Sequence, residues 1–155
     1  MQIDTAAMVI AVFALVWQMH QSNKQSKMHF FSIYTQRYQD IVINLPIGLE
    51  SSEFSLNSFN DEKKEEILRW IRAYFDLCSE EYHLNKDGFI DNKIWKLWDA
   101  GMKDSLRKPA FIEAWKLIQI NNYYDSNFAE YVINIQGDAI CIIRCSSKDA
   151  LTRAA

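Results

Sequence analysis

One stretch near the start of the chain, from Ala6 to Trp17, is apolar on every face of a helix. It carries no charge, and its one hydrogen-bonding side chain is the indole of Trp17. A helix that is hydrophobic all round is buried, either inside protein or in a membrane. We therefore predict that residues 1–22 form an N-terminal transmembrane anchor, with residues 5–19 in contact with the lipid bilayer.

The length of this segment lies at the lower limit for crossing a bilayer. Residues 1–19 span about 28 Å as a helix, against about 30 Å of hydrocarbon, and local thinning or snorkelling covers the difference. The basic side chains Lys24 and Lys27 follow the segment, whereas the one charged side chain before it is the acidic Asp4. The positive-inside rule then places the N-terminus outside and the rest of the chain in the cytoplasm. The alternative is a soluble helix buried in the core of an oligomer.

Composition excludes several classes of protein. Apolar residues make up 49% and aromatic residues 14% of the 155 residues, which excludes an intrinsically disordered chain. The net charge of -3 provides no general attraction for nucleic acid, so we expect no direct binding of duplex nucleic acid. The three cysteines, Cys78, Cys141 and Cys145, show no disulfide framework, which favours reduced thiols in the cytosol.

Glycine and proline set the expected helix boundaries. No Gly or Pro occurs before Pro46, so one helix can run from about Thr5 to about Leu45, with Asp4 or Thr5 as its N-cap. Pro46 and Gly48 end it. A loop at residues 50–60 follows, and we expect its apolar side chains to attach it to the domain. These are Phe54, Leu56 and Phe59.

Four more helices are predicted from the helical period of the apolar residues. The first begins near residues 58–61 and ends at 85–88, and the others span residues 92–107, 109–120 and 126–136. Their inward faces are Ile67, Ile71, Tyr74, Phe75, Cys78 and Tyr82; then Ile94, Trp95, Trp98, Met102 and Leu106; then Phe111, Ile112, Trp115 and Ile118; and last Phe128, Val132 and Ile135.

The predicted fold class is therefore all-α. An N-terminal single-pass helix, or a long buried one, continues through a connector at residues 23–45 into a cytosolic domain of four to five helices. This domain spans residues 46–138, and residues 139–155 form a short C-terminal extension.

Two features are candidates for a site. Lys93, Lys96, Lys103 and Arg107 form one stripe along a predicted helix, which is either a solvated face or a site for a small anion such as a nucleotide phosphate or a lipid headgroup. Glu81 lies on the same flank as aromatic residues. It is either a buried, hydrogen-bonded carboxylate or a residue at the rim that leans to water, and the rarity of buried unpaired Glu favours the rim.

The turn from Asn85 to Asp91 resembles the middle of an EF-hand calcium loop, but the carboxylates at its first and last positions are missing. A helix–turn–helix, with Gly88 after the first helix and Asp91 capping the next, explains the same residues. We expect no metal site and no cofactor. No catalytic constellation is recognisable, and His20, His29 and His83 are scattered. The prediction is a protein that is not an enzyme.

Several short segments support a resemblance over about half of the chain. They are Arg37-Tyr-Gln-Asp-Ile41, Leu45-Pro46, Tyr74-Phe-Asp-Leu-Cys-Ser-Glu-Glu-Tyr82, Gly88-Phe-Ile-Asp91, Trp95-Lys-Leu-Trp98, Gly101-Met102 and Pro109-Ala-Phe111 with Ala114-Trp115. In these the chain resembles small bacterial membrane-anchored α-helical proteins of unknown function. The resemblance implies a tether to the bacterial inner membrane and a helical cytosolic domain, and no activity.

The function expected from these features is a membrane-anchored binding or regulatory module that recruits a protein partner. The alternative is an oligomeric, ligand-gated membrane effector of a defence type, which senses a cytosolic anion or nucleotide messenger. Homo-oligomers are expected in either case, since a short span is relieved by clustering. A hydrolase that uses Glu81 is the third hypothesis.

Overall fold

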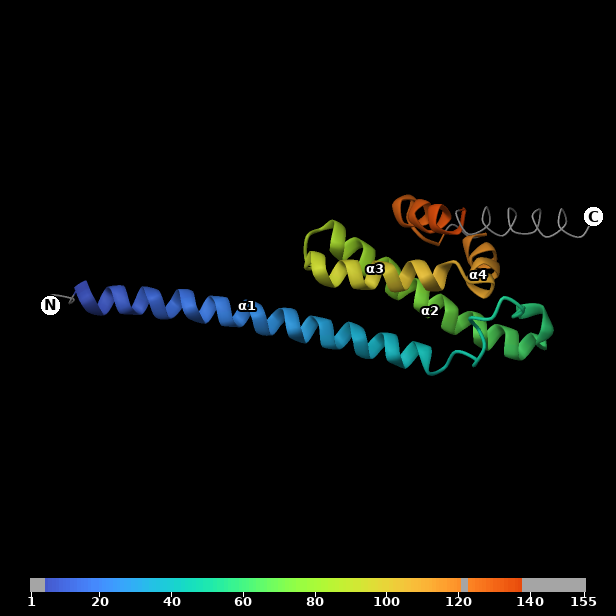
Figure 1. Ribbon diagram of the computed structural model, residues 1–155, viewed down its shortest axis with the longest axis horizontal. Coiled ribbons are helices and arrows are strands. Elements are labelled where there is room, and N and C mark those ends of the chain that lie inside the picture. The colour runs from blue at the N-terminus through green and yellow to red at the C-terminus, as the bar shows by residue number, and fades with distance from the viewer. Residues whose placement is uncertain (1–4, 121–122, 138–155) are drawn as a thin grey trace, which may run out of the picture. The chain divides into compact units, whose positions relative to one another are not determined.

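The computed structural model describes residues 5–120 and 123–137. These residues form helices and the turns between them, with no strand among them (Figure 1). The all-α prediction is therefore confirmed. The chain divides after Gln39 into two compact units, which are described separately below.

Helix α1, Thr5–Val42, is a single helix of 38 residues. It has the predicted start and ends a few residues before the predicted Leu45, because Asn44 and Leu45 donate their backbone N–H groups in turns to Ile41 and Val42. Asp4, the other expected N-cap, lies outside the described residues.

The apolar side chains of α1 between residues 7 and 19 are exposed. Their exposed fractions range from 54% to 72% for Met8, Val9, Ile10, Val12, Phe13, Leu15, Val16, Trp17 and Met19. Among the described residues, however, there is no helix whose length and apolar character together suffice for a membrane crossing.

Helix α2, Asp61–Lys86, is the central element of the second unit and packs on α3 and α4. Asn60 caps it by accepting a hydrogen bond from the Lys63 N–H, and Asp61 and Glu62 lie in its first turn, where the helix dipole favours negative charge. Every residue of its predicted inward face is buried: Ile67, Ile71, Tyr74, Phe75, Cys78 and Tyr82.

Helices α3, Asn92–Leu106, and α4, Pro109–Gln119, follow as predicted, and residues 126–137 form a further helix. The turn before α3 confirms the helix–turn–helix interpretation: Gly88 has a φ of 77°, and the Asp91 side chain caps α3 by accepting from the Lys93 N–H. Pro109 occupies the first turn of α4, where its missing N–H costs nothing.

The predicted inward face of α3 is only partly correct. Met102 and Leu106 are buried, but Ile94, Trp95 and Trp98 in its first half are half-buried. The helical period gives the direction of a side chain and not how much protein covers it. Trp95 borders an open groove instead of a closed core.

The loop before α2 is attached to the domain through the 3₁₀ turn Leu56–Ser58. Leu56 is fully buried, as predicted, and its backbone N–H donates to Glu113 Oε2 of α4 at 3.1 Å. Glu113 Oε1 accepts from Asn57 Nδ2 at 2.9 Å. One carboxylate therefore satisfies two donors that the loop itself leaves without a partner.

Aromatic rings form much of the core of the second unit. Phe75 of α2 lies 4.9 Å from Trp115 of α4, and Trp115 stacks on Tyr124 at 5.4 Å between ring centroids. Phe128 is fully buried against these rings, and Val132 and Ile135 are buried on the same helix, as predicted. Such offset and edge-on packing holds the helix at residues 126–137 to α2 and α4.

Candidate functional site

An open groove of about 500 Å³ lies in the second unit. We call it the α2–α3 groove, because α2 and α3 supply most of its wall and the helix at residues 126–137 supplies the rest. It is lined by Tyr82, Asn85, Lys86, Trp95, Asp99, Lys103, Asn127, Glu130, Tyr131 and Asn134. The volume lies within the usual range of small-molecule sites, and the lining is more polar than in most of them.

Asp99 organises the polar part of this groove. Its Oδ1 accepts a hydrogen bond from the Tyr131 hydroxyl at 2.8 Å, and its Oδ2 accepts one from Lys103 Nζ at 2.6 Å. Partial burial, followed by the hydrogen bond to Asp99, raises the pKa of Tyr131. The phenol therefore stays protonated and donates, and both carboxylate oxygens of Asp99 are already engaged.

Aromatic rings and a second cation complete the wall. The rings of Tyr82 and Tyr131 lie 5.0 Å apart, and Lys86 Nζ lies 5.3 Å from the centroid of the Tyr82 ring. Trp95, on α3, is half-buried and also lines the groove. The groove thus combines ring surface with ammonium groups, a combination that suits ligands with both a flat and an anionic part.

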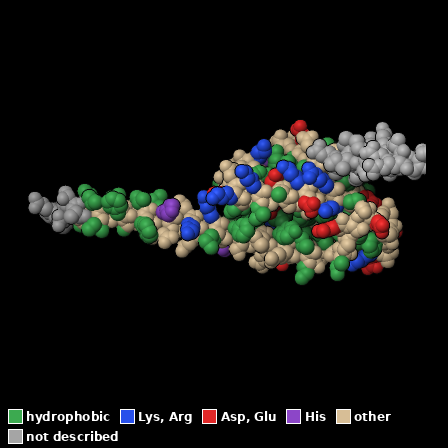
Figure 2. All heavy atoms as spheres, in the orientation of Figure 1, with side chains coloured by type: hydrophobic (Ala, Val, Ile, Leu, Met, Phe, Trp, Pro, Cys, Tyr) green, Lys and Arg blue, Asp and Glu red, His purple; other side chains and the backbone are tan. Residues whose placement is uncertain are grey.

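The predicted basic stripe is present on the surface. Figure 2 shows Lys and Arg side chains in a row over α3. Lys93, Lys96 and Arg107 are exposed, and none of the described carboxylates lies within ion-pair distance of them. Lys103 differs, because it is half-buried and paired with Asp99. It is also the one member of the predicted stripe that lines the groove.

Glu81 is buried, with 6% of its surface exposed, so the interpretation as a rim residue is wrong. The helical period placed it on the aromatic flank, and the packing around α2 closes over that flank. Burial, followed by the negative charge of Glu81, raises the pKa of the Cys78 thiol well above its ordinary value. The same charge contributes to the raised pKa of Tyr131. Glu81 lies about one helical turn after Cys78 on α2.

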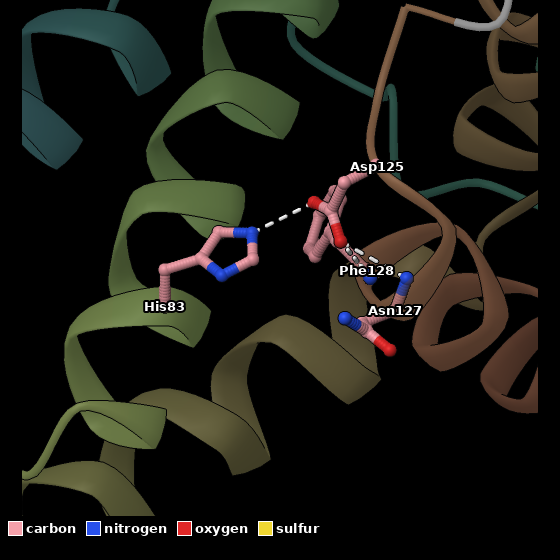
Figure 3. Close-up of polar contacts among 4 residues, drawn as sticks. All are labelled: His83, Asp125, Asn127 and Phe128. Atoms are coloured by element: carbon pink, nitrogen blue, oxygen red, sulfur yellow. Dashed lines mark hydrogen bonds and ion pairs between the residues drawn. The ribbon is translucent and has the colours of Figure 1, made fainter.

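His83 and Asp125 form a contact that sequence analysis missed. His83 Nε2 lies 2.7 Å from Asp125 Oδ2, and Asp125 Oδ1 accepts from the backbone N–H groups of Asn127 at 2.9 Å and Phe128 at 3.2 Å (Figure 3). Asp125 therefore caps the helix at residues 126–137 and connects it to α2. An Asp directly before a predicted helix is a recognisable capping signal, but nothing near His83 in the sequence indicates its partner.

The electrostatics of Asp125 follow from these bonds. Burial alone would raise the pKa of its carboxyl group, but the hydrogen bonds with His83 and with the two backbone N–H groups outweigh that effect and lower it. The His83 and Asp125 side chains are 44% and 41% exposed. The pair is therefore a partly solvated contact between helices. Within the described residues no hydroxyl or thiol bonds to His83 to make it a catalytic base.

No group of three or more His, Cys, Asp or Glu side chains within residues 5–120 and 123–137 could hold a metal ion. Asp91, a ligand in the calcium interpretation, is engaged as the cap of α3. Cys141 and Cys145 lie outside the described residues, as does the predicted extension at 139–155.

No protein-family model, curated protein or solved structure matches this chain.

Proposed function

We propose that the chain is a binding module tethered to a membrane, acting by recognition and not by catalysis. The observation that carries this proposal is the ring of exposed apolar side chains on α1 between residues 7 and 19. Burying this much apolar surface is strongly favourable, and monomeric proteins in water rarely leave so large a patch uncovered.

Lipid is the partner that best fits this surface. The side chains point in all directions around the helix, so one flat protein surface would cover only part of them. Trp17 lies at the end of the segment, where indoles favour the membrane interface. Lys24 and Lys27, which come next, favour the cytoplasmic side. These features support attachment at the bacterial inner membrane, with the N-terminus outside and the helical domain in the cytoplasm.

The short segment favours more than one copy per assembly. Residues 5–19 span about 22 Å as a helix, which is less than about 30 Å of hydrocarbon. Clustering of several copies relieves such a mismatch. Ala7, Ala11 and Ala14 would permit close contact between neighbouring helices.

The second unit supports recognition in either of two forms. In the first, the protein is a regulatory module that brings a protein partner to the membrane. The second is a ligand-gated effector. The exposed cations Lys93, Lys96 and Arg107 favour it, because they follow α3, which supplies part of the groove wall, and have no ion-pair partner among the described residues. The hydrolase hypothesis has less support, because Glu81 is buried and a carboxylate that activates water must be accessible to it.

Fractionation of cells tests the tether. We expect the full-length chain in the membrane fraction, resistant to high salt, and a chain that starts at Asn23 in the soluble fraction. A matched pair separates hydrophobic insertion from a change in charge: Phe13→Lys adds a cation at the centre of the segment, and Gln25→Lys adds one beyond it. A central Lys costs about 2.5–3.5 kcal/mol on insertion scales, so only Phe13→Lys should shift the protein to the soluble fraction. If both variants fractionate like the original chain, the segment is not inserted in lipid.

A further inference from the structure

We propose that the α2–α3 groove is a binding site for a mononucleotide, that is, a ligand with a flat base and a phosphate group. The inference rests on the proposed function, because it supplies a ligand for the binding module. Three kinds of side chain in the groove support it: ammonium groups, aromatic rings and amides.

The lysines of the groove would bind the phosphate group. Lys86 contacts the Tyr82 ring and has no carboxylate partner among the described residues. Lys103 lies in the same groove, with its ammonium 2.6 Å from Asp99. A phosphate that contacts both lysines would replace the weak cation–π contact of Lys86 with the Tyr82 ring. It would also accept a hydrogen bond from Lys103, whose ammonium group is already held in place by Asp99. The row of Lys93, Lys96 and Arg107 along α3 adds a positive field that attracts anions toward the groove.

The aromatic rings and the side-chain amides of the groove would bind the base. Trp95 is half-buried, so part of its surface stays open to the groove, and Tyr82 and Tyr131 add further ring surface. Base stacking on aromatic side chains is favourable for every base. Asn85, Asn127 and Asn134 offer both donors and acceptors, as the polar edge of a base requires. An inorganic anion would not stack on these rings.

Two carboxylates limit the strength of such binding. Asp99 competes with the phosphate for Lys103. Glu130 also lines the groove and has no ion-pair partner among the described residues, so it repels an anion directly. The groove is therefore expected to hold a mononucleotide with moderate affinity. Removal of the Glu130 charge should strengthen binding, an effect that a purely structural Glu130 would not produce.

A phosphate group could also come from a lipid headgroup, and the ring distinguishes the two sources. A headgroup phosphate carries no flat base to stack on Trp95. Binding that depends on Lys86 and Lys103 but not on Trp95 would therefore indicate a lipid, whereas binding that depends on all three indicates a nucleotide.

The test is isothermal titration of the full-length chain in neutral detergent with each of four 5′-mononucleotides, the matching nucleosides, inorganic phosphate, and nanodiscs of phosphatidylglycerol or phosphatidylcholine. We expect at least one mononucleotide to bind at least about tenfold more tightly than its nucleoside and than inorganic phosphate, since each good contact contributes about a factor of ten. Phosphatidylglycerol should not compete with it.

Variants assign the binding to the groove. Lys86→Gln, Lys103→Gln and Trp95→Leu should each weaken binding by about tenfold, and Glu130→Gln should strengthen it several-fold. Lys116→Gln is the matched control, because Lys116 is an exposed cation on α4 that does not line the groove. Each variant is compared with the original chain by circular dichroism and thermal unfolding, so that a loss of fold is not mistaken for a loss of binding.

Four results would overturn the proposal: no mononucleotide binds, inorganic phosphate or phosphatidylglycerol binds as tightly as the mononucleotides, Trp95→Leu leaves binding unchanged, or Lys116→Gln weakens binding as much as Lys103→Gln. The titration is independent of the tether. If the chain binds mononucleotides but fractionates as soluble, the proposed nucleotide site stands and the proposed membrane tether fails. If the chain fractionates with membranes but binds no mononucleotide, the tether stands and the nucleotide site fails.

Discussion

At the scale of single residues, Asp125 connects two helices. Its carboxylate accepts two backbone N–H groups at the start of the helix at residues 126–137 and also contacts His83 of α2. That helix supplies part of the wall of the α2–α3 groove. The position of the wall therefore depends on a cap that is partly exposed to water.

Substitution of Asp125 tests this role. We expect Asp125→Ala to reduce the free energy of unfolding by about 1–2 kcal/mol, the usual effect of losing a cap. His83→Gln should cost less than about 1 kcal/mol, because exposed pairs contribute little. Urea denaturation of a chain that starts at Asn23, followed by circular dichroism, measures both. Equal losses in the two variants would mean that the contact with His83, and not the cap, is the important interaction.

The lowered pKa of Asp125 also predicts a dependence on pH. A carboxyl group whose folded pKa lies below its unfolded value, about 3.9, stabilises the fold fully above that value. The stabilisation is lost as pH falls through the lower, folded pKa. Asp125→Asn should therefore unfold with a weaker dependence on pH below about 4 than the original chain. Identical pH profiles between pH 2 and 5 would contradict the prediction.

Some of the roles of these residues can be predicted from the sequence, and others cannot. The capping role of Asp125 can be predicted from its position before an apolar helix. The contact with His83 cannot, since the two residues are 42 positions apart and meet only through the packing of two helices. Glu113 illustrates the same limit, because it bonds to Leu56, 57 positions away. The burial of Glu81 was wrongly assessed for this reason as well.

At the scale of elements, the boundaries of the helices are local properties. Gly88 has a left-handed φ of 77° after α2, and Asp91 caps α3 only five residues after Lys86, the last residue of α2. Proline and glycine mark such boundaries in the sequence itself, so the helices were predicted to within a few residues. The groove was not, because it depends on which faces of three helices meet.

A pair of glycines tests the turn between α2 and α3. Gly88→Ala should destabilise the chain by about 1–2 kcal/mol, since a Cβ at this φ is strained. Gly101→Ala should stabilise it by about 0.5–1 kcal/mol, because Gly101 lies within α3 with open space around an added Cβ. Thermal unfolding measures both changes. A Gly88→Ala variant as stable as the original chain would show that the turn does not impose the strained conformation.

At the scale of the whole molecule, the chain consists of two units with different expected surroundings. The second unit, from Asp40 onward, has its own buried core of apolar and aromatic residues. In the first unit, α1 exposes its apolar residues between positions 7 and 19 on every side. Sequence analysis identified both features from composition and periodicity. The sequence predicts that lipid covers α1, and this prediction has to be tested with molecules other than the chain.

The central claim is that lipid covers the apolar part of α1, and flotation of the purified chain with liposomes tests it most directly. The full-length protein, freed of detergent in the presence of phosphatidylglycerol liposomes, should float with them through a density gradient, and the chain that starts at Asn23 should remain at the bottom. A full-length protein that stays at the bottom, and sediments without lipid or detergent as one monodisperse species, would contradict the account.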